Sequence, residues 1–389
     1  MTERDRARRP RVLVLFYDGK GYGGAEAHLI LLLRHLDRTR YEPQLVIAGR
    51  TWSQVPAQLA EKLRSSGVPI HTTPIDTGNK TVGFLRTVKM LRSIGAELAY
   101  VGTSTAIGLR SDLLAIRLSG MQIVRLLHMP AGSMKEFHRA RWSAREVRLL
   151  DRLVTLDLTV SDTDRLGLFA EFGISKDKIE VCYHGVDLER FVVRCTTSEA
   201  KSKLGLSPDV PTVGLIGRLS IEKGHRYLID AAPKILEEAG PTQFLFVGSG
   251  DRYDELKSLV KERGLQSHFV FTGFQDDVTR WIEAVDVVVM PSLFESAGLV
   301  MLECLAMERP VVVSDLPSIR DHVSEEACVL IPTRDPQAIA REVVALLKDP
   351  RRREELGRRG LDLIRRRFEL RRHVSQLMST FDRVLAERN

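Results

Sequence analysis

Residues 287–313 read VVVMPSLFESAGLVMLECLAMERPVVV, which indicates a strand, a loop, a helix and a second strand in close succession. The apolar, β-branched run at 287–289 is typical of a buried parallel strand, and Pro291 ends it. Gly298 allows a close backbone approach where the helix starts, and Pro310 ends that helix. This order predicts an α/β domain. The free N–H groups at the helix start favour an anion such as a phosphate.

Two carboxylates flank the start of this helix. Glu295 lies in the loop three residues before Gly298, and Glu303 lies five residues after it. A rise of about 1.5 Å per residue puts Glu303 roughly 7–8 Å along the helix. Two acceptors of hydroxyl hydrogen bonds around a phosphate site suit a nucleotide sugar, which has hydroxyl groups on both sides of its diphosphate. The alternative is an ordinary βα unit whose glutamates face water.

The run ESAGLVMLECLAMERPVV resembles the E-x7-E segment of glycosyltransferase family 4, whose members are retaining enzymes of the GT-B fold. The resemblance implies that Glu295 orients the transferred sugar and that Glu303 holds the ribose. The residues that it places at the bound donor are Ser296, Gly298, Leu299, Val300 and Glu303. Where the family usually has glycine before the x-Pro-Val-Val run, this chain has Glu308, which we expect to alter the end of the helix but not the site.

The composition indicates a globular protein of two domains. Its 389 residues are 43% hydrophobic, and no apolar run approaches the roughly 20 residues that span a bilayer. The charged N-terminus and the short apolar run after it do not match a signal peptide. The four cysteines show no C-x-x-C spacing, which favours structural thiols over disulfides or zinc ligands. We expect a cytoplasmic protein, with the inner face of the membrane as an alternative place.

Apolar strands alternate with helical patterns through both halves of the chain, which predicts parallel, doubly wound sheets. Ligands of such sheets bind at the carboxyl ends of the strands. We expect two Rossmann-like domains that face each other across a cleft, as in the GT-B fold. The first, 1–190, would bind the acceptor, and the second, 191–367, the nucleotide sugar, with 187–201 as a linker. The last helix, 368–389, resembles the family's final helix, which packs on the N-terminal domain.

Arg218 and Lys223 leave the turn after a predicted strand, five residues apart. Two cations at the carboxyl end of a strand can neutralise a diphosphate. An exposed arginine and an exposed lysine are the simpler interpretation. The runs GRL and EKG within 217–224 resemble the family, however, and this implies that both cations stabilise the leaving group. The resemblance also places three residues of neighbouring turns near the nucleotide, namely Gly217, Gly250 and Phe274.

A glycine-rich turn at 19–24 precedes the first helix, a pattern of phosphate sites and also of plain tight turns. It looks like the family's first-domain loop, which implies that Gly23 and Gly24 contact the donor diphosphate. His128 ends the fifth predicted strand, where a local hydrogen bond is the ordinary role of a histidine. The cleft-facing position and the family's sugar-contacting histidine imply a catalytic role instead. His184, in YHGVD, replaces the family's usual Asn, and we interpret this turn as hinge structure.

The net charge is +7, and some of it lies on a predicted amphipathic helix at 134–151. The arginines on or beside its basic face are Arg141, Arg145, Arg148 and Arg152. A solvated surface helix is the simpler interpretation, and contact with an anionic membrane is the alternative. No aromatic residues interleave the basic runs of the C-terminal region, and no DNA-binding motif is present, so we expect no nucleic-acid partner.

The predicted reaction moves a sugar from a UDP- or GDP-sugar to a glycan, lipid-linked or small-molecule acceptor. No carboxylate stands out as a nucleophile, which favours displacement on the front face of the sugar. Asp276 and Asp277 look like helix caps, and no D-x-D follows a strand, so we expect no divalent metal and no other cofactor. Three alternatives remain: a sugar-nucleotide-binding protein that has lost catalysis, a GT-B sugar-nucleotide epimerase, and a starch- or sucrose-type synthase.

Overall fold

The protein forms two compact units, of which unit 1 comprises Met1–His184 and Arg371–Asn389 and unit 2 comprises Gly185–Leu370. The domain limits expected at 190 and 367 stay predictions, beside unit boundaries at 184–185 and 370–371. The computed structural model describes residues 12–17, 24–48, 55, 57–73, 80–103, 110–128 and 143–387. Among these residues, no helix combines the length and the apolar character needed to cross a membrane.

In its described part, unit 1 contains a parallel sheet of seven strands in the order β3-β2-β1-β4-β5-β6-β7. The strands are β1 Val12–Tyr17, β2 Gln44–Ala48, β3 Ile70–Thr72, β4 Leu98–Thr103, β5 Gln122–Leu127, β6 Leu156–Thr159 and β7 Ile179–Val181. The helices are α1 Gly24–His35, α2 Ala57–Arg64, α3 Lys80–Ile94, α4 Arg110–Leu118, α6 Ala144–Asp151, α7 Asp162–Phe172 and α16 Leu370–Ala386, with the 3-10 helix η3 at Lys176–Lys178.

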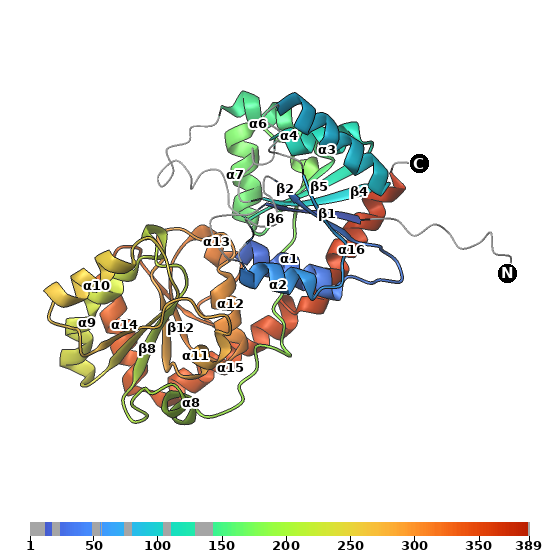
Figure 1. Ribbon diagram of the computed structural model, residues 1–389. Helices are drawn as coiled ribbons and strands as arrows, with labels where there is room; N and C mark the ends of the chain where they lie inside the picture. The colour runs from blue at the N-terminus through green and yellow to red at the C-terminus, as the bar shows by residue number, and fades with distance from the viewer. Residues whose placement is uncertain are drawn as a thin grey trace. The chain divides into compact units, whose positions relative to one another are not determined.

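Side chains of the sheet alternate between two covered faces, as expected for strands buried on both sides. On one face, Val101 of β4 packs with Leu91 of α3 and Ile116 of α4. On the other, the Tyr100 ring meets Phe381 of α16 at 5.5 Å between centroids. Figure 1 shows α3 and α4 on one side of this sheet, and α1 and α16 on the other. The C-terminal helix therefore packs on the N-terminal unit.

A buried ion pair joins two neighbouring strands of unit 1. Arg125 of β5 and Asp157 of β6 lie opposite each other in the sheet register, and neither side chain is exposed. The guanidinium donates from Nε to Oδ1 at 2.6 Å and from Nη2 to Oδ2 at 2.9 Å. Such a bidentate pair satisfies both charges inside the sheet.

Unit 2, whose residues are all described, has a parallel sheet of six strands in the order β10-β9-β8-β11-β12-β13. The strands are β8 Thr212–Ile216, β9 Gln243–Val247, β10 Phe269–Phe271, β11 Val287–Met290, β12 Val311–Ser314 and β13 Val329–Ile331. The helices are α8 Thr197–Lys203, α9 His225–Ala239, α10 Tyr253–Glu262, α11 Thr279–Glu283, α12 Leu299–Ala306, α13 Pro317–Arg320, α14 Pro336–Lys348 and α15 Pro350–Arg367, with the 3-10 helix η4 at Ile221–Lys223.

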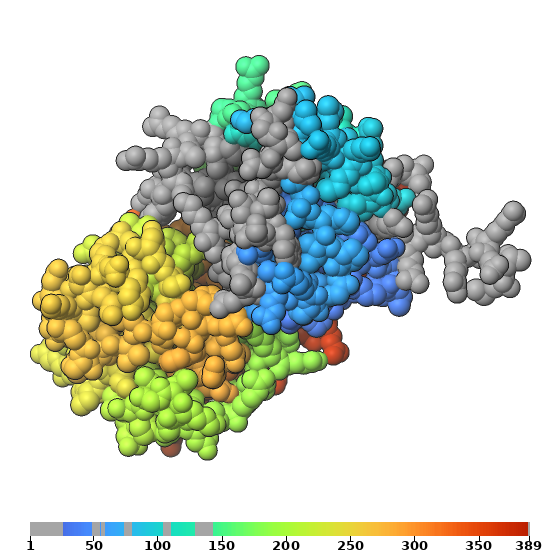
Figure 2. Space-filling model, viewed as in Figure 1, coloured from blue at the N-terminus to red at the C-terminus, as the bar shows by residue number. Residues whose placement is uncertain are grey.

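The main core of unit 2 lies between the sheet and two helices, α9 and α14. Val213 of β8 and Val287 of β11 pack there with Leu228 and Val343 of these helices. Figure 1 shows α9, α10 and α14 on this side of the sheet and α11 and α12 on the other. In the space-filling view of Figure 2, α10 forms part of the outer surface.

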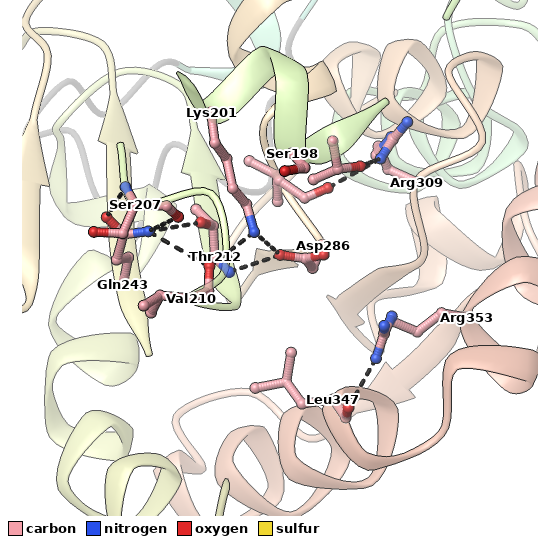
Figure 3. A network of polar contacts seen from close by, with 12 residues as sticks. Ser198, Lys201, Ser207, Val210, Thr212, Gln243, Asp286, Arg309, Leu347 and Arg353 are labelled. Atoms are coloured by element: carbon pink, nitrogen blue, oxygen red, sulfur yellow. Dashed lines mark hydrogen bonds and ion pairs between the residues drawn. The ribbon is translucent and has the colours of Figure 1, made fainter. Parts of the chain in front are cut away.

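A partly buried ion pair fastens the start of unit 2 to the amino ends of its strands (Figure 3). Lys201 of α8 donates to Asp286 at 2.6 Å and to the carbonyl of Val210 at 2.8 Å, with only 4% of its side chain exposed. Asp286 also accepts from the backbone N–H of Thr212 at 2.8 Å. These contacts lie at the end of the strands opposite to the end where the predicted site residues follow β8 and β11.

The linker expected at 187–201 is partly wrong, because residues from Thr197 onward are helical. Thr196 and Glu199 form a capping box at the start of α8, with the Thr196 side chain accepting from the N–H of Glu199 and the Glu199 side chain accepting from the N–H of Thr196. A threonine followed three residues later by glutamate is a sequence signal for a helix start, and periodicity alone misses it in so short a helix. Among the described residues, the cysteines are free thiols, as expected.

Candidate active site

The strand order of unit 2 reverses direction between β8 and β11. The chain after β8 runs toward one side of the sheet, and the chain after β11 runs toward the other, so the carboxyl ends of these strands border a crevice where α/β proteins bind ligands. The two runs that carry the predicted site follow these two strands. Residues far apart in the sequence, around 217–224 and 291–303, therefore lie at one edge of the sheet.

Lys223 and Glu295 meet at this edge. Lys223 Nζ donates to Glu295 Oε1 at 2.5 Å, and the carboxylate is buried while the lysine side chain remains 24% exposed. The Ser292 hydroxyl also donates to Glu295 Oε1, at 3.0 Å. The Ser318 hydroxyl donates to the main-chain carbonyl of Glu295 at 2.5 Å, which fixes the backbone of the loop. Neither serine could be predicted from the sequence, because serines beside a turn carry no pattern that separates them from other loop serines.

The loop after β8 and the loop after β11 touch at Gly224, where any side chain would force the backbone of one loop to move. Gly224 has φ +68°, and a Cβ placed there would lie 2.0 Å from the carbonyl oxygen of Pro291. The N–H of Leu293 donates to the carbonyl of Glu222 at 2.8 Å beside it. Glycine is needed at this point for both its left-handed backbone and its lack of a side chain. This contact sets the distance between the Lys223 and Glu295 backbones.

The other glycines of the predicted donor site line the same edge. A Cβ on Gly248 would lie 2.0 Å from the carbonyl oxygen of Gly217, and a Cβ on Gly250 would lie 2.2 Å from that of Leu219. The turns after β8 and β9 thus pack backbone against backbone. Arg218 lies in the first of these turns with an exposed side chain. Phe274, in the turn after β10, is 39% exposed.

Helix α12 starts beside Glu295. Gly298 precedes it with φ +58°, and no side chain caps its N-terminus among the described residues. The backbone N–H groups at Leu299 and Val300 belong to the first turn, where helices leave donors without an internal partner. The hydroxyl of Ser296 is buried and has no hydrogen-bond partner among the described residues. A buried hydroxyl next to free amides provides several donors for an anion.

Glu303 lies farther along α12 and is less solvated than an ordinary surface carboxylate. Burial raises the pKa of Glu303 to about 7, and the positive charge of Arg190 opposes this increase. Near neutral pH the carboxyl group is therefore on the border between its charged and neutral forms. Either form can accept a hydrogen bond from a hydroxyl group.

The end of α12 has a backbone conformation typical of glycine. Glu308 has φ 55°, the left-handed conformation that glycine adopts at helix ends at little cost. A Cβ on Gly357 of α15 would lie 2.2 Å from the Glu308 carbonyl oxygen, so α15 packs closely on this turn. Because the surrounding structure holds the turn in this conformation, the backbone of Glu308 is strained.

The expectation that Asp276 and Asp277 cap a helix holds only in part, because the N-cap residue of α11 is Val278 and Asp277 lies just before it. Its Oδ1 accepts from the N–H of Thr279 at 3.1 Å and from the Thr279 hydroxyl at 2.6 Å, at the first residue of α11. These bonds engage one oxygen of this carboxylate in holding the helix start.

The predicted site residues of the first half belong to unit 1. Gly24 is the first residue of α1, whereas Gly23 lies outside the described residues. His128 follows β5 and is half-buried, and its ring stacks on His184 at 5.4 Å between centroids. Burial, with a smaller contribution from His373, lowers the pKa of His128 to about 4, so its imidazole is neutral at pH 7.

Part of the predicted basic helix is present as α6. Arg145 and Arg148 lie on it with exposed side chains, and Arg152 caps its C-terminus. Ser143 and Glu146 form a capping box at its start, and Arg110 pairs with Glu146 at 3.3 Å. Arg141 and the region before it lie outside the described residues.

Two family models match the chain. The model described as Glycosyltransferase Family 4 matches residues 22–190, and the one described as Glycosyl transferases group 1 matches residues 210–349. Both matches fall on the regions that contain the predicted site residues, and together they reach into both units.

Curated proteins and solved structures resemble the chain as well. An uncharacterized glycosyltransferase of Methanocaldococcus jannaschii is 32% identical over 198 residues, 49% of this chain and 50% of that protein. The α-D-kanosaminyltransferase of Streptomyces kanamyceticus is 31% identical over 188 residues, 47% of this chain and 48% of that protein. The matches thus span about half the length of these two relatives. Anabaena HepE, solved in complex with UDP-glucose, shares the fold with a TM-score of 0.81 at 21% identity, over 96% of this chain and 99% of that one.

Proposed function

Because the chain belongs to the family 4 type of GT-B glycosyltransferases, we propose that it transfers a sugar from a nucleoside diphosphate sugar to an acceptor, with retention of the anomeric configuration. The observation that carries this proposal is the meeting of Lys223 and Glu295 at the switch point of the unit 2 sheet, beside the uncapped start of α12. A cation and free amides suit a diphosphate, and a carboxylate suits sugar hydroxyl groups.

The roles follow from where charge develops during the reaction. The bond between the anomeric carbon and the diphosphate oxygen breaks, so negative charge grows on the phosphate. Lys223, Arg218 and the amides of Leu299 and Val300 would stabilise that charge. The acceptor oxygen bonds to the same face of the sugar, and its proton passes to the departing phosphate oxygen. Glu295 would orient the sugar during this exchange.

Glu303 would accept hydrogen bonds from the ribose hydroxyl groups of the donor. The contributions of His128, Gly23 and Gly24 rest on the resemblance, which implies that His128 contacts the sugar and that the glycines contact the diphosphate. Gly217, Gly250 and Phe274 would border the nucleotide, because they occupy the turns after β8, β9 and β10.

The donor would be a UDP- or GDP-sugar. Anabaena HepE, which shares the fold, was solved with UDP-glucose, and this supports a UDP-sugar as the first choice. The acceptor would be a glycan, a lipid-linked glycan or a small molecule. A cytoplasmic chain that touches an anionic membrane through Arg145 and Arg148 would suit a lipid-linked acceptor, and the exposed Leu149, next to Arg148 on the same helix, supports such contact.

Lys223 and Arg218 would supply the positive charge at the diphosphate, so we propose that the reaction needs no metal there. Added Mg²⁺ or Mn²⁺ would leave the rate of donor cleavage unchanged. A catalytically lapsed sugar-nucleotide-binding protein is the second candidate. It would bind the same donors through the same residues but would not cleave them.

The test is the release of nucleoside diphosphate from a panel of UDP-, GDP- and ADP-sugars without acceptor. We expect slow hydrolysis of one donor, and we expect Arg218→Ala and Glu295→Ala to abolish it. Product analysis by NMR, with methanol as a surrogate acceptor, would show whether the anomer is retained. Binding of a donor without cleavage, with or without acceptors, would favour the lapsed protein. A chain that binds none of the donors and cleaves none of them would overturn the proposal.

A further inference from the structure

Four histidines lie together inside unit 1, and we call them the imidazole cluster: His28, His128, His184 and His373. His28 lies on α1, His128 after β5, His184 after β7, and His373 on α16. The ring centroid of His28 is 4.8 Å from that of His184 and 4.9 Å from that of His373. His28, His184 and His373 are buried, at 4–5% exposure.

Hydrogen bonds of His373 orient its ring toward His28. His373 Nδ1 lies 2.6 Å from the carbonyl oxygen of Tyr183, which can only accept, so Nδ1 carries a proton. In the neutral ring Nε2 then carries a lone pair, which faces His28 Nε2 at 2.7 Å. Metal-bound histidines show the same arrangement, with one nitrogen donating to a carbonyl and the other facing the ion.

The spacing of the nitrogens fits one ion after small movements. One ring nitrogen from each of the three buried histidines lies within 4.8 Å of the other two. Zinc binds imidazole at about 2.0–2.1 Å, so tetrahedral ligands are about 3.3 Å apart. An ion would replace the hydrogen bond between His28 and His373, widen that pair slightly, and draw His184 closer.

The chemistry of the cluster also favours a metal over a proton. Burial and the neighbouring imidazoles lower the pKa of His28 well below its ordinary value, and burial lowers the pKa of His373 to about 4. Imidazole ligands suit Zn²⁺ and its first-row neighbours, whereas Mg²⁺ and Ca²⁺ prefer oxygen.

We propose that His28, His184 and His373 bind a transition-metal ion of the zinc class. The fourth coordination position would stay open to water on the side of His128, whose ring centroid is 5.6 Å from that of His28. Three imidazoles and an open position form a familiar zinc coordination set.

The ligand positions indicate what the ion would do. His184 is the last residue of unit 1 before the chain passes into unit 2, and His373 is close to the point where the chain returns. The ion would thus tie α1 to both of these segments. Because metal binding to a folded site stabilises the fold, the ion would hold α16 against the rest of unit 1. The ion would take no part in the stabilisation of the leaving group, which is proposed for Lys223, Arg218 and the start of α12.

The first experiment measures metal in the purified full-length chain without a histidine tag. We expect about one zinc per chain after extensive dialysis, and its loss in His28→Gln and in His373→Gln. His35→Gln is the matched control, because His35 lies on the same helix with an exposed side chain, and it should keep the metal. Retention of the metal by both cluster variants would overturn the proposal.

A second measurement does not depend on whether the variants fold. The wild-type chain is stripped with a chelator and titrated with Co²⁺ and, separately, with Zn²⁺. We expect visible absorption bands of four-coordinate Co²⁺ that saturate at one ion per chain, and a rise of several degrees in Tm with Zn²⁺. A metal-free chain with no Co²⁺ bands and an unchanged Tm would show that the cluster is a purely hydrogen-bonded set of imidazoles.

Discussion

The Lys223–Glu295 site of unit 2 and the imidazole cluster of unit 1 gather polar groups in different ways. Lys223 and Glu295 are 72 positions apart, and each stands in a glycine-containing turn at the carboxyl end of a neighbouring strand. His28 and His373 are 345 positions apart, on helices from the two ends of the chain. The first site is charged and partly exposed, whereas the second is neutral and buried. The difference teaches that a site at the ends of neighbouring strands can be predicted from the sequence, whereas a site formed by the packing of distant helices cannot.

The largest expected effect comes from removing the cation of the unit 2 site. Lys223→Ala should lower the rate of donor cleavage by about 10²–10³-fold, because one preorganised donor to the developing charge is lost. The measurement is the release of nucleoside diphosphate at saturating donor. Lys234→Ala is the control, since Lys234 pairs with Glu238 on α9. Equal rates of donor cleavage in the two variants would contradict the role of Lys223. The unit 2 site would then no longer differ from the imidazole cluster by its catalytic charge.

The next effect concerns the contact that sets the site geometry. Gly224 and Gly264 share φ +68°. A Cβ at Gly224 would lie 2.0 Å from the carbonyl oxygen of Pro291, whereas a Cβ at Gly264 would have no atom within 4 Å. Gly264→Ala should cost about 1–2 kcal/mol of unfolding free energy from backbone strain. Gly224→Ala should cost about 2–3 kcal/mol more, from steric overlap. Urea unfolding compares them, and equal costs would show that the two loops do not need this close approach.

A smaller effect depends on pH. Because the pKa of Glu303 is raised from 4.5 to about 7, the folded protein keeps a proton that the unfolded chain releases, so unfolding free energy falls as pH rises through that window. Glu303→Gln should therefore be about 1–3 kcal/mol more stable than the wild type at pH 8 without ligand, and nearly equal to it at pH 4.5. Glu237→Gln, at an exposed position of α9, is the control. A stability difference that is the same at both pH values would contradict the raised pKa.

The smallest effect lies at the end of α12. Glu308→Gly should raise the unfolding free energy by about 1 kcal/mol, because glycine adopts φ 55° without strain. Glu354→Gly, in the second turn of α15, should lower it by about 1 kcal/mol. Thermal unfolding of both variants measures the difference. A loss of stability in Glu308→Gly would mean that its side chain contributes more than its backbone costs.

The sequence predicts the fold and the location of the unit 2 site, but it does not predict all the residues that support this site. Alternating strands and helices predict parallel sheets, and the E-x7-E and GRL–EKG runs predict which strand ends carry the site. The serines that hold Glu295 could not be predicted, because Ser292 and Ser318 act through the geometry of the loop. The imidazole cluster also escaped prediction. His28 and His373 carry no spacing signal within their amphipathic helices, and only the packing of α1 and α16 brings them together.

The most direct test of the account is hydrogen exchange with and without the nucleoside diphosphate of the donor that the panel selects. If unit 2 holds that nucleotide as proposed, exchange should slow for the amides of 217–224 and at the start of α12, 298–302. Peptides from the far end of the same sheet, such as those around Lys201 and Asp286, should be unchanged. Saturating nucleotide that leaves 217–224 and 298–302 unprotected would contradict the assignment of the donor site.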